Sequence, residues 1–237
     1  MRLKKPMLSS LIGQAYIMPL IAFLAFVGLS ILSCDNHEAV DTNMHIGYVL
    51  CEDNSCMDTA TYFHQTAKKG VGVVFFEKND SVPALAVMLD EYRAAYSDTI
   101  SVSFGTSTNI KEFNGRANTV AMLNSSNDKG SSPIAQIAFT SHADGQSEYI
   151  PCVLEMRLLS QVAPTINPII KRLGGTPIAL SGDCWYWTSN EVSSNENNQA
   201  WLCSAPNGSI LESSKIKSHK VRTIIQINRV SSSLCQF

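Results

Sequence analysis

The sequence predicts an α+β domain, and three observations lead to this prediction. Two apolar runs rich in β-branched and aromatic residues, at positions 71–76 and 84–89, are separated by a polar turn and indicate a pair of strands. Apolar residues then recur at helical spacing between positions 110 and 173. In the last fifty residues the pattern returns to that of strands. Strands, then helices, then strands again are typical of an α+β domain.

The first 33 residues differ from the rest of the chain. Three basic residues lie among the first five, and positions 6–33 hold no charged residue. This is the layout of a secretory signal. An uncharged run of this length is also long enough to span a bilayer as an uncleaved anchor. The small residue Ser33 and the abrupt polar sequence from Asp35 favour cleavage.

The tetrapeptide Ile31-Leu32-Ser33-Cys34 resembles the lipobox of bacterial lipoproteins. The resemblance implies that the Cys34 sulfur receives a diacylglyceryl group and that the signal peptide is cut just before it. Two or three acyl chains anchor a protein firmly, whereas one does not. We therefore expect a signal peptide over residues 1–33, a lipidated tether over 34–44 and one domain over 45–237. The expected location is the bacterial cell envelope, lipid-anchored at the outer membrane on its surface or periplasmic face.

The charge of the mature chain argues against nucleic-acid binding. Removing the three basic residues of the leader leaves 15 basic residues against 20 acidic ones, a net charge of −5. Nucleic-acid-binding domains instead concentrate Lys and Arg on one face. The expected contacts are therefore the membrane, through the lipid anchor, and a glycan or protein ligand; the sequence leaves the oligomeric state open.

Six cysteines in an exported chain indicate disulfides. They are Cys51, Cys56, Cys152, Cys184, Cys203 and Cys235. The first two bracket a short polar loop, and Cys184 and Cys203 flank a predicted hairpin that turns near Asn195, so these two pairs have local support. Metal ligation is the weaker alternative, because the spacings fit no common zinc pattern and no His lies at ligand spacing. Six cysteines permit fifteen pairings, and the oxidation state stays open.

The elements follow in order along the chain. Helices are predicted over residues 110–122 and 132–139, then from Pro151 through Leu159, and again up to the Gly174-Gly175 pair that ends a helix. Strands are predicted over residues 184–189, 200–204 and 221–227. The polar turn at positions 206–208 separates the last two.

Several ordered motifs resemble the Lcl C-terminal domain family. Residues 186–191 resemble its YWSSTE motif, and they are followed by Ala200-Trp201, Gly208 and Val221-Arg222; upstream matches lie at residues 72–76, 105–107, 118–119 and 149–156. The resemblance runs from about residue 70 to residue 227. It implies a C-type lectin-like domain, with a small twisted antiparallel sheet and flanking helices. Cys152 and Asn190 depart from the residues usual in the family.

The expected fold-core residues are Trp185, Trp187, Trp201 and Arg222. The first two tryptophans lie two apart on one predicted strand and so share a face. The third lies on the predicted partner strand, at a distance that allows cross-strand packing. We expect Arg222 to form a structural ion pair with Glu191 or Glu155.

No catalytic constellation is evident, and neither a catalytic residue, a metal nor a cofactor is predicted. The five histidines are scattered, and phosphate-binding, zincin and EF-hand motifs do not occur.

The candidate ligand-facing residues are Asn190, Glu191, Asn195, Glu196, Asn197 and Asn198, with a solvated hairpin tip as the alternative. The expected function is a surface-exposed binding or adhesion module for a glycan or protein ligand. An accessory structural subunit of an envelope or surface-appendage assembly is the first alternative, and an envelope-polymer hydrolase the second.

Overall fold

The computed structural model describes residues 44–64, 67–125, 130–139 and 148–227. These residues form one sheet whose eight strands lie in the order β2-β1-β3-β4-β8-β5-β6-β7. The strands are β1 (Val49–Cys51), β2 (Cys56–Met57), β3 (Gly70–Phe76), β4 (Ala84–Ala95), β5 (Trp185–Glu191), β6 (Gln199–Ser204), β7 (Ile210–Ser214) and β8 (Ser218–Ile227). Neighbouring strands run antiparallel except β5 and β8, which run parallel, so the sheet is mixed.

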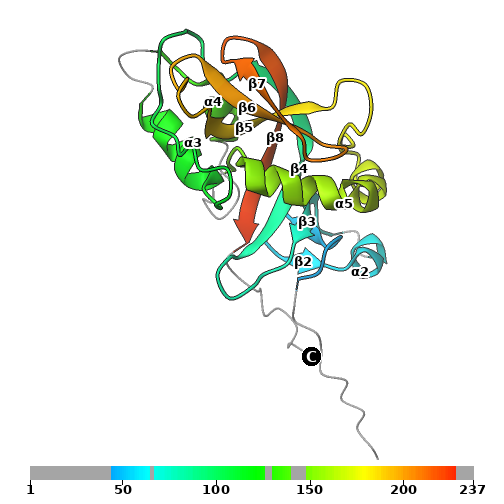
Figure 1. The fold of residues 1–237 in the computed structure, drawn as a ribbon. Coiled ribbons are helices and arrows are strands. Elements are labelled where there is room, and N and C mark those ends of the chain that lie inside the picture. The colour runs from blue at the N-terminus through cyan, green and yellow to red at the C-terminus, as the bar shows by residue number, and fades with distance from the viewer. Residues whose placement is uncertain (1–43, 65–66, 126–129, 140–147, 228–237) are drawn as a thin grey trace, which may run out of the picture. The chain divides into compact units, whose positions relative to one another are not determined.

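Among the described residues, four helices lie beside the sheet (Figure 1). They are α2 (Thr59–His64), α3 (Gly115–Asn124), α4 (Pro133–Ala138) and α5 (Val153–Arg172). The longest, α5, crosses one face of the sheet and contacts β3, β5 and β6. Helices α3 and α4 contact each other, and they also contact β5 and β4, respectively.

The apolar face of α5 forms the centre of the larger core. Met156, Leu159, Ala163, Ile166 and Ile170 are fully buried against residues of β3, β4, β5 and β8. Each fully buried aliphatic side chain of this size contributes about 1.5–3 kcal/mol. At its start, Cys152 and Glu155 form a capping box, in which the Glu155 carboxylate accepts a hydrogen bond from the Cys152 amide at 2.7 Å.

The predicted fold class is wrong. The resemblance implied a C-type lectin-like α+β domain with a small antiparallel sheet, whereas the described residues form an eight-stranded mixed sheet with few helices. Two long strands account for much of the difference. β4 and β8 pair from Ala84↔Ile227 to Ala95↔Ser218 and join the two halves into one sheet.

The second half of β4 was not predicted, because its side chains do not show the pattern of a strand. Residues 90–95 read Asp-Glu-Tyr-Arg-Ala-Ala, without a run of apolar residues. This half pairs with β8, and most of its side chains are exposed or half-buried. Pairing with a distant strand, rather than burial of one face, therefore holds it in the sheet.

Other predicted elements agree with the structure to different degrees. The predicted hairpin of residues 71–76 and 84–89 is confirmed, since β3 and β4 are antiparallel neighbours. The predicted helix at 110–122 begins later, at Gly115, and the two helices predicted between Pro151 and Gly174 are one helix, α5. In addition, α5 contains Pro164 and Pro168 in its interior, although proline cannot donate the helical hydrogen bond.

The export signal and the lipidation site lie outside the described residues. This applies to residues 1–33, to Cys34 and to the tether as far as residue 43. Within the described ranges no helix is both long and apolar enough to cross a membrane.

Candidate functional site

A cleft of about 520 Å³ opens where β3 and β4 separate. The last residues that pair between β3 and β4 at this end are Gly72 and Met88. Before Gly72, β3 pairs only with its other neighbour, β1, as far as Gly70, which lies opposite Cys51. The start of β3 and the middle of β4 therefore become opposite walls. Turns from α2 and the end of α5 close the cleft on a third side.

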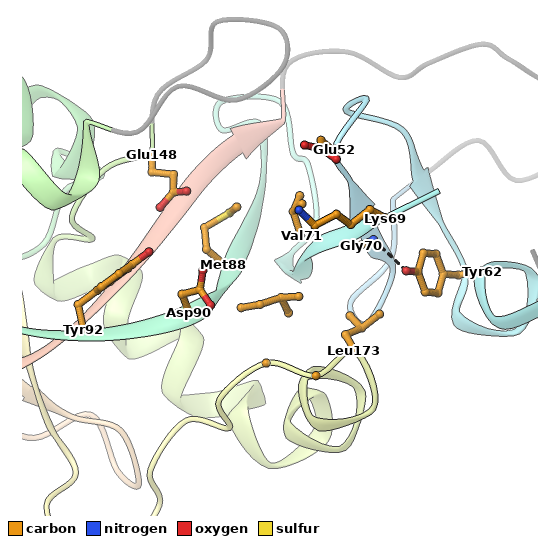
Figure 2. Close-up of a pocket in the computed structure, with 13 residues that line it drawn as sticks. Glu52, Tyr62, Lys69, Gly70, Val71, Met88, Asp90, Tyr92, Glu148 and Leu173 are labelled. Carbon is orange, nitrogen blue, oxygen red and sulfur yellow. Dashed lines mark hydrogen bonds between the residues drawn. The ribbon is translucent and has the colours of Figure 1, made fainter. Parts of the chain in front are cut away.

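The β4 wall is a bulge in the sheet. Val87 pairs with Ile224 of β8, and the next paired residues are Glu91 and Arg222. Three residues of β4, positions 88–90, therefore lie opposite one residue of β8. A bulge bends a strand and re-aims its side chains, which is consistent with three consecutive residues, Met88, Leu89 and Asp90, all lining the cleft. Met88 and Asp90 are labelled in Figure 2.

Arg222, on the neighbouring strand β8, binds backbone carbonyl groups of the bulge. Its guanidinium donates hydrogen bonds to the carbonyl oxygens of Met88 at 3.2 Å, Leu89 at 2.9 Å and Thr176 at 2.6 Å. The same group lies 3.3 Å from a carboxylate oxygen of Glu91, and the Arg222 side chain is fully buried. A buried cation on the neighbouring strand therefore stabilises the β4 wall, together with the Thr176 amide, which donates to the Leu89 carbonyl at 3.0 Å.

Glycines bring the remaining walls close together. A Cβ at Gly175 would lie 2.8 Å from the Cβ of Leu89, so the chain after α5 approaches the bulge only because this residue lacks a side chain. On the β3 side, the Tyr62 hydroxyl accepts a hydrogen bond from the Gly70 amide at 2.8 Å. These contacts join α2, β3 and the end of α5 around the cleft.

The charged residues of the cleft are mostly acidic. Among the residues that the structure describes, Glu52, Asp90 and Glu148 line it together with one cation, Lys69 (Figure 2). Glu148 is only 8% exposed, and its carboxylate accepts a hydrogen bond from the Thr223 hydroxyl.

Asp90, Tyr92 and Glu148 gather toward one end of the cleft (Figure 2). Burial raises the pKa of Tyr92 above its ordinary value, and the negative charges of Asp90 and Glu148 raise it further, while Arg222 opposes them. A phenol resists ionisation when it is buried and when it lies next to anions, so Asp90 and Glu148 add to the larger effect of burial on the pKa of Tyr92.

We expect the substitution Asp90→Asn to lower the pKa of Tyr92 toward its ordinary value of about 10. The amide removes one of the negative charges that disfavour the phenolate. The measurement is an NMR titration of ¹³C-labelled tyrosine, with the signal assigned through Tyr92→Phe. The matched control is Asp80→Asn, which removes the same charge at an exposed position that does not line the cleft. An unchanged Tyr92 pKa in Asp90→Asn would contradict this electrostatic description.

The groups that line the cleft offer ionic contacts, hydrogen bonds and apolar surface. The described residues that line it include two tyrosines and several apolar side chains. Among the residues that the structure describes, no three His, Cys, Asp or Glu side chains lie close enough to hold a metal ion. The described lining can therefore contact a ligand through carboxylates, an ammonium group, phenol hydroxyls and apolar surface.

Two of the predicted ligand-facing residues lie in the interior. Asn190 is fully buried, and its side-chain oxygen accepts a hydrogen bond from the Val153 amide at 2.9 Å, at the start of α5. Its amide group donates to the Ser107 carbonyl at 2.7 Å. Asn190 therefore connects β5 to α5 and to the chain before α3, and it does not face solvent.

Glu191 is also fully buried, and its carboxylate forms an ion pair with Lys215. It accepts hydrogen bonds from the backbone amides of Phe104 at 2.7 Å and Thr106 at 3.2 Å. Of the predicted ligand-facing residues, only those at the tip of the loop reach solvent. There, Asn195 and Glu196 are half-buried, and Asn197 and Asn198 are exposed.

The predicted core residues differ in burial. Trp187 is fully buried and its indole N–H donates to the Ala94 carbonyl at 3.1 Å, whereas Trp185 and Trp201 are half-buried. Arg222 is fully buried, but its ion-pair partner is Glu91 and not the predicted Glu191 or Glu155. Those two glutamates bind Lys215 and the start of α5, respectively.

The predicted disulfide between Cys51 and Cys56 is absent, since both are free thiols. Cys56 pairs with Leu50 across the two strands, so their side chains share one face. Cys51 follows Leu50 directly and points to the opposite face. The register of β1 and β2 therefore separates the two sulfur atoms. Burial raises the pKa of Cys56 to about 12.

Cys184 and Cys203 are free for a different reason. Cys203 pairs with Tyr186, two residues beyond Cys184, which makes the two cysteines diagonal neighbours. Diagonal positions lie about 7–8 Å apart, whereas the Cβ atoms of a disulfide lie about 3.5–4.5 Å apart. Cys152 is also a free buried thiol, and Cys235 lies outside the described residues.

Comparison with solved structures finds a similar fold in a fimbrial protein from Bacteroides ovatus ATCC 8483. The TM-score is 0.58 and the sequence identity is 13%, and the aligned region covers 77% of this chain and 48% of that chain. The chain therefore spans about half the length of the fimbrial protein. No family model matches the chain, and no curated protein matches it. The likeness concerns the fold and supports its correction, while the resemblance to the Lcl C-terminal domain family stays a prediction.

The residues of the cleft were not predicted as a site. A signal for them was present in the sequence, since the charged pair Asp90-Glu91 and Tyr92 follow directly after a predicted apolar strand. Charged residues at that position indicate either a turn or a strand that continues without a buried face. The structure shows the second case.

Proposed function

We propose that the protein is a lipid-anchored accessory subunit of an envelope or surface-appendage assembly. The observation that supports this function best is the fold shared with the fimbrial protein from Bacteroides ovatus over 77% of the chain. Fold alone does not imply function, so the proposal also relies on the lipobox-like sequence that ends at Cys34.

A membrane anchor and a binding cleft are the two features that an accessory subunit requires. The lipid on Cys34 would hold the domain at the membrane, and the tether would keep it beside its partners. The cleft between β3 and β4 offers a concave surface with charged and apolar groups. Its volume of about 520 Å³ lies within the range of known ligand sites, about 300–1,000 Å³.

We expect a membrane-permeable lysine-directed crosslinker, applied to intact cells, to trap the protein in one product of fixed mass. A fixed partner is expected because a structural subunit occupies one place in its assembly. The matched control is Cys34→Ser, which removes the lipid acceptor and should reduce both the yield of this product and the membrane-bound fraction. Recovery of the wild-type protein solely as a monomer after crosslinking would contradict the proposal.

A second candidate function is the binding of a glycan or protein ligand at the cell surface, and the cleft supports it. Two tyrosine rings line the cleft, and aromatic rings provide contact area for ligands of both classes. A screen of the full-length protein against glycans and matrix proteins distinguishes the two candidates. Binding of a soluble ligand without a fixed crosslinked partner would favour this second function.

A further inference from the structure

We propose that the cleft between β3 and β4 binds a lysine or arginine side chain carried by an extended segment of a partner polypeptide. This inference rests on the proposed function for the identity of the partner. To that function the inference adds the chemical class of the partner group that the cleft binds.

The dimensions of the cleft suit one long side chain with part of its backbone. The space measures about 520 Å³ and is open to solvent. It lies between the start of β3 and the bulge of β4, beyond Gly72 and Met88, the last residues that pair between these two strands. A ligand segment can therefore enter along the gap between the strands without breaking a paired part of the sheet.

The charges of the cleft favour a positive ligand. In the described part of the lining, Glu52, Asp90 and Glu148 contribute three carboxylates and Lys69 contributes one ammonium group. Asp90 and Glu148 lie toward the β4 end, whereas Lys69 precedes β3 on the other wall (Figure 2). The negative charge is thus concentrated at one end, and Lys69 does not pair with it in the structure.

The depth of this acidic end distinguishes it from an ordinary solvated surface. Glu148 is 8% exposed and still lines the cleft, with its carboxylate oriented by the Thr223 hydroxyl. An incoming cation would gain a contact that is screened less than one at the protein surface.

A metal ion fits this cleft less well than an organic cation. In the described parts of the chain, no group of three His, Cys, Asp or Glu side chains is close enough to bind one ion. The three carboxylates come from separate segments, with Asp90 and Glu148 toward one end of the cleft and Glu52 near Lys69 (Figure 2). Charges distributed in this way can be contacted by an extended ligand that has a cationic tip and hydrogen-bonding groups along its length.

The remaining walls match the stem of such a side chain. Met88 and Leu89 of the bulge and Leu173 at the end of α5 provide apolar surface inside the cleft. Lysine and arginine bury their methylene stems along apolar surfaces of this kind while the charged group contacts polar atoms. The ring of Tyr92, which is 37% exposed, is available to a cation beside Asp90.

Two peptides test the proposal on the full-length protein in detergent. One is acetyl-Ser-Val-Lys-Val-Ser-amide, and its control replaces the lysine with norleucine, which keeps the stem and removes the charge. Calorimetry is expected to show at least tenfold tighter binding of the lysine peptide, because a single well-placed ion pair of about 1.4 kcal/mol corresponds to that factor. Equal binding of the two peptides, or binding of neither, would overturn the proposal.

A protein variant locates the contact. Asp90→Asn is expected to weaken binding of the lysine peptide about tenfold, while Asp80→Asn leaves it unchanged because Asp80 does not line the cleft. Equal weakening by the two variants would mean that only net charge matters, and it would overturn the assignment to this cleft.

Spermidine separates a polypeptide ligand from a free amine. We expect spermidine to bind more weakly than the lysine peptide, since it lacks a backbone to fill the gap between the strands. Tighter or equal binding of spermidine would overturn the assignment to a polypeptide. Failure of these binding tests would leave the crosslinking result untouched, so the accessory role and its proposed contact are tested separately.

Discussion

Replacing Glu191 with alanine is expected to lower the free energy of unfolding by about 3–5 kcal/mol. The ammonium group of Lys215 is fully buried and forms its ion pair with this carboxylate. Burial already lowers the pKa of Lys215, and the Glu191 charge opposes that effect. Without the carboxylate, a buried cation remains with the Val102 carbonyl as a hydrogen-bond acceptor at 2.7 Å.

The same substitution also removes a backbone anchor. The amides of Phe104 and Thr106 both donate to Glu191, so the chain before α3 loses its attachment to β5. Each buried donor left without an acceptor costs about 1–3 kcal/mol. These costs overlap with the loss of the ion pair, because the region relaxes as one unit.

Chemical denaturation followed by tryptophan fluorescence measures the effect. The matched control is Glu212→Ala on the edge strand β7, where the side chain is exposed and a change within about 0.5 kcal/mol is expected. The double variant Glu191→Gln with Lys215→Met removes both charges and should recover part of the loss. An effect of Glu191→Ala as small as that of the control would show that the buried ion pair does not stabilise this fold.

Replacing Arg222 with methionine is expected to cost about 3–5 kcal/mol as well, and to change the cleft. The carbonyl oxygens of Met88, Leu89 and Thr176 each lose the hydrogen bond from Arg222, although Leu89 keeps one from the Thr176 amide at 3.0 Å. Glu91 loses one of its two cations. Methionine is close in length and apolar, so the change tests the charge and the hydrogen bonds more than the packed volume.

The matched control is Arg93→Met on the same sheet. Arg93 pairs with Asp183 at an exposed position, where side-chain exposures are 53% and 46%. Exposed ion pairs contribute about 0–1 kcal/mol, so a small change is expected in the same denaturation assay. Similar losses in Arg222→Met and Arg93→Met would contradict the role assigned to Arg222. Hydrogen exchange at residues 88–90 should rise in Arg222→Met alone.

Some features of the fold could be predicted from the sequence because they depend on local patterns. The β-branched and aromatic run of β3 and the apolar run that begins β4 indicated a hairpin, and they form one. The apolar spacing of Ile166, Ile169 and Ile170 indicated a helix, and these residues lie in α5. In both cases one face of the element is buried, and burial of one face leaves a periodic pattern in the sequence.

Other features could not be predicted because they depend on partners far along the chain. The disulfide predictions assumed that cysteines near each other on neighbouring strands can meet, but register decides which side chains face each other. Cys56 lies opposite Leu50, and Cys203 lies opposite Tyr186. A shift of one or two residues, which the sequence pattern does not reveal, keeps these sulfur atoms apart.

The candidate site shows the same division. The sequence by itself determined the export-like leader, the acidic balance of the residues after position 33, the β3–β4 hairpin and the helical character of residues 153–172, but not that these form one helix. The tertiary structure alone decided where the cleft lies, since its β4 wall is a bulge held by Arg222, 133 residues after Leu89. Local patterns report which residues are buried, whereas strand order and register follow from contacts between distant segments. The acidic cleft is a product of those contacts.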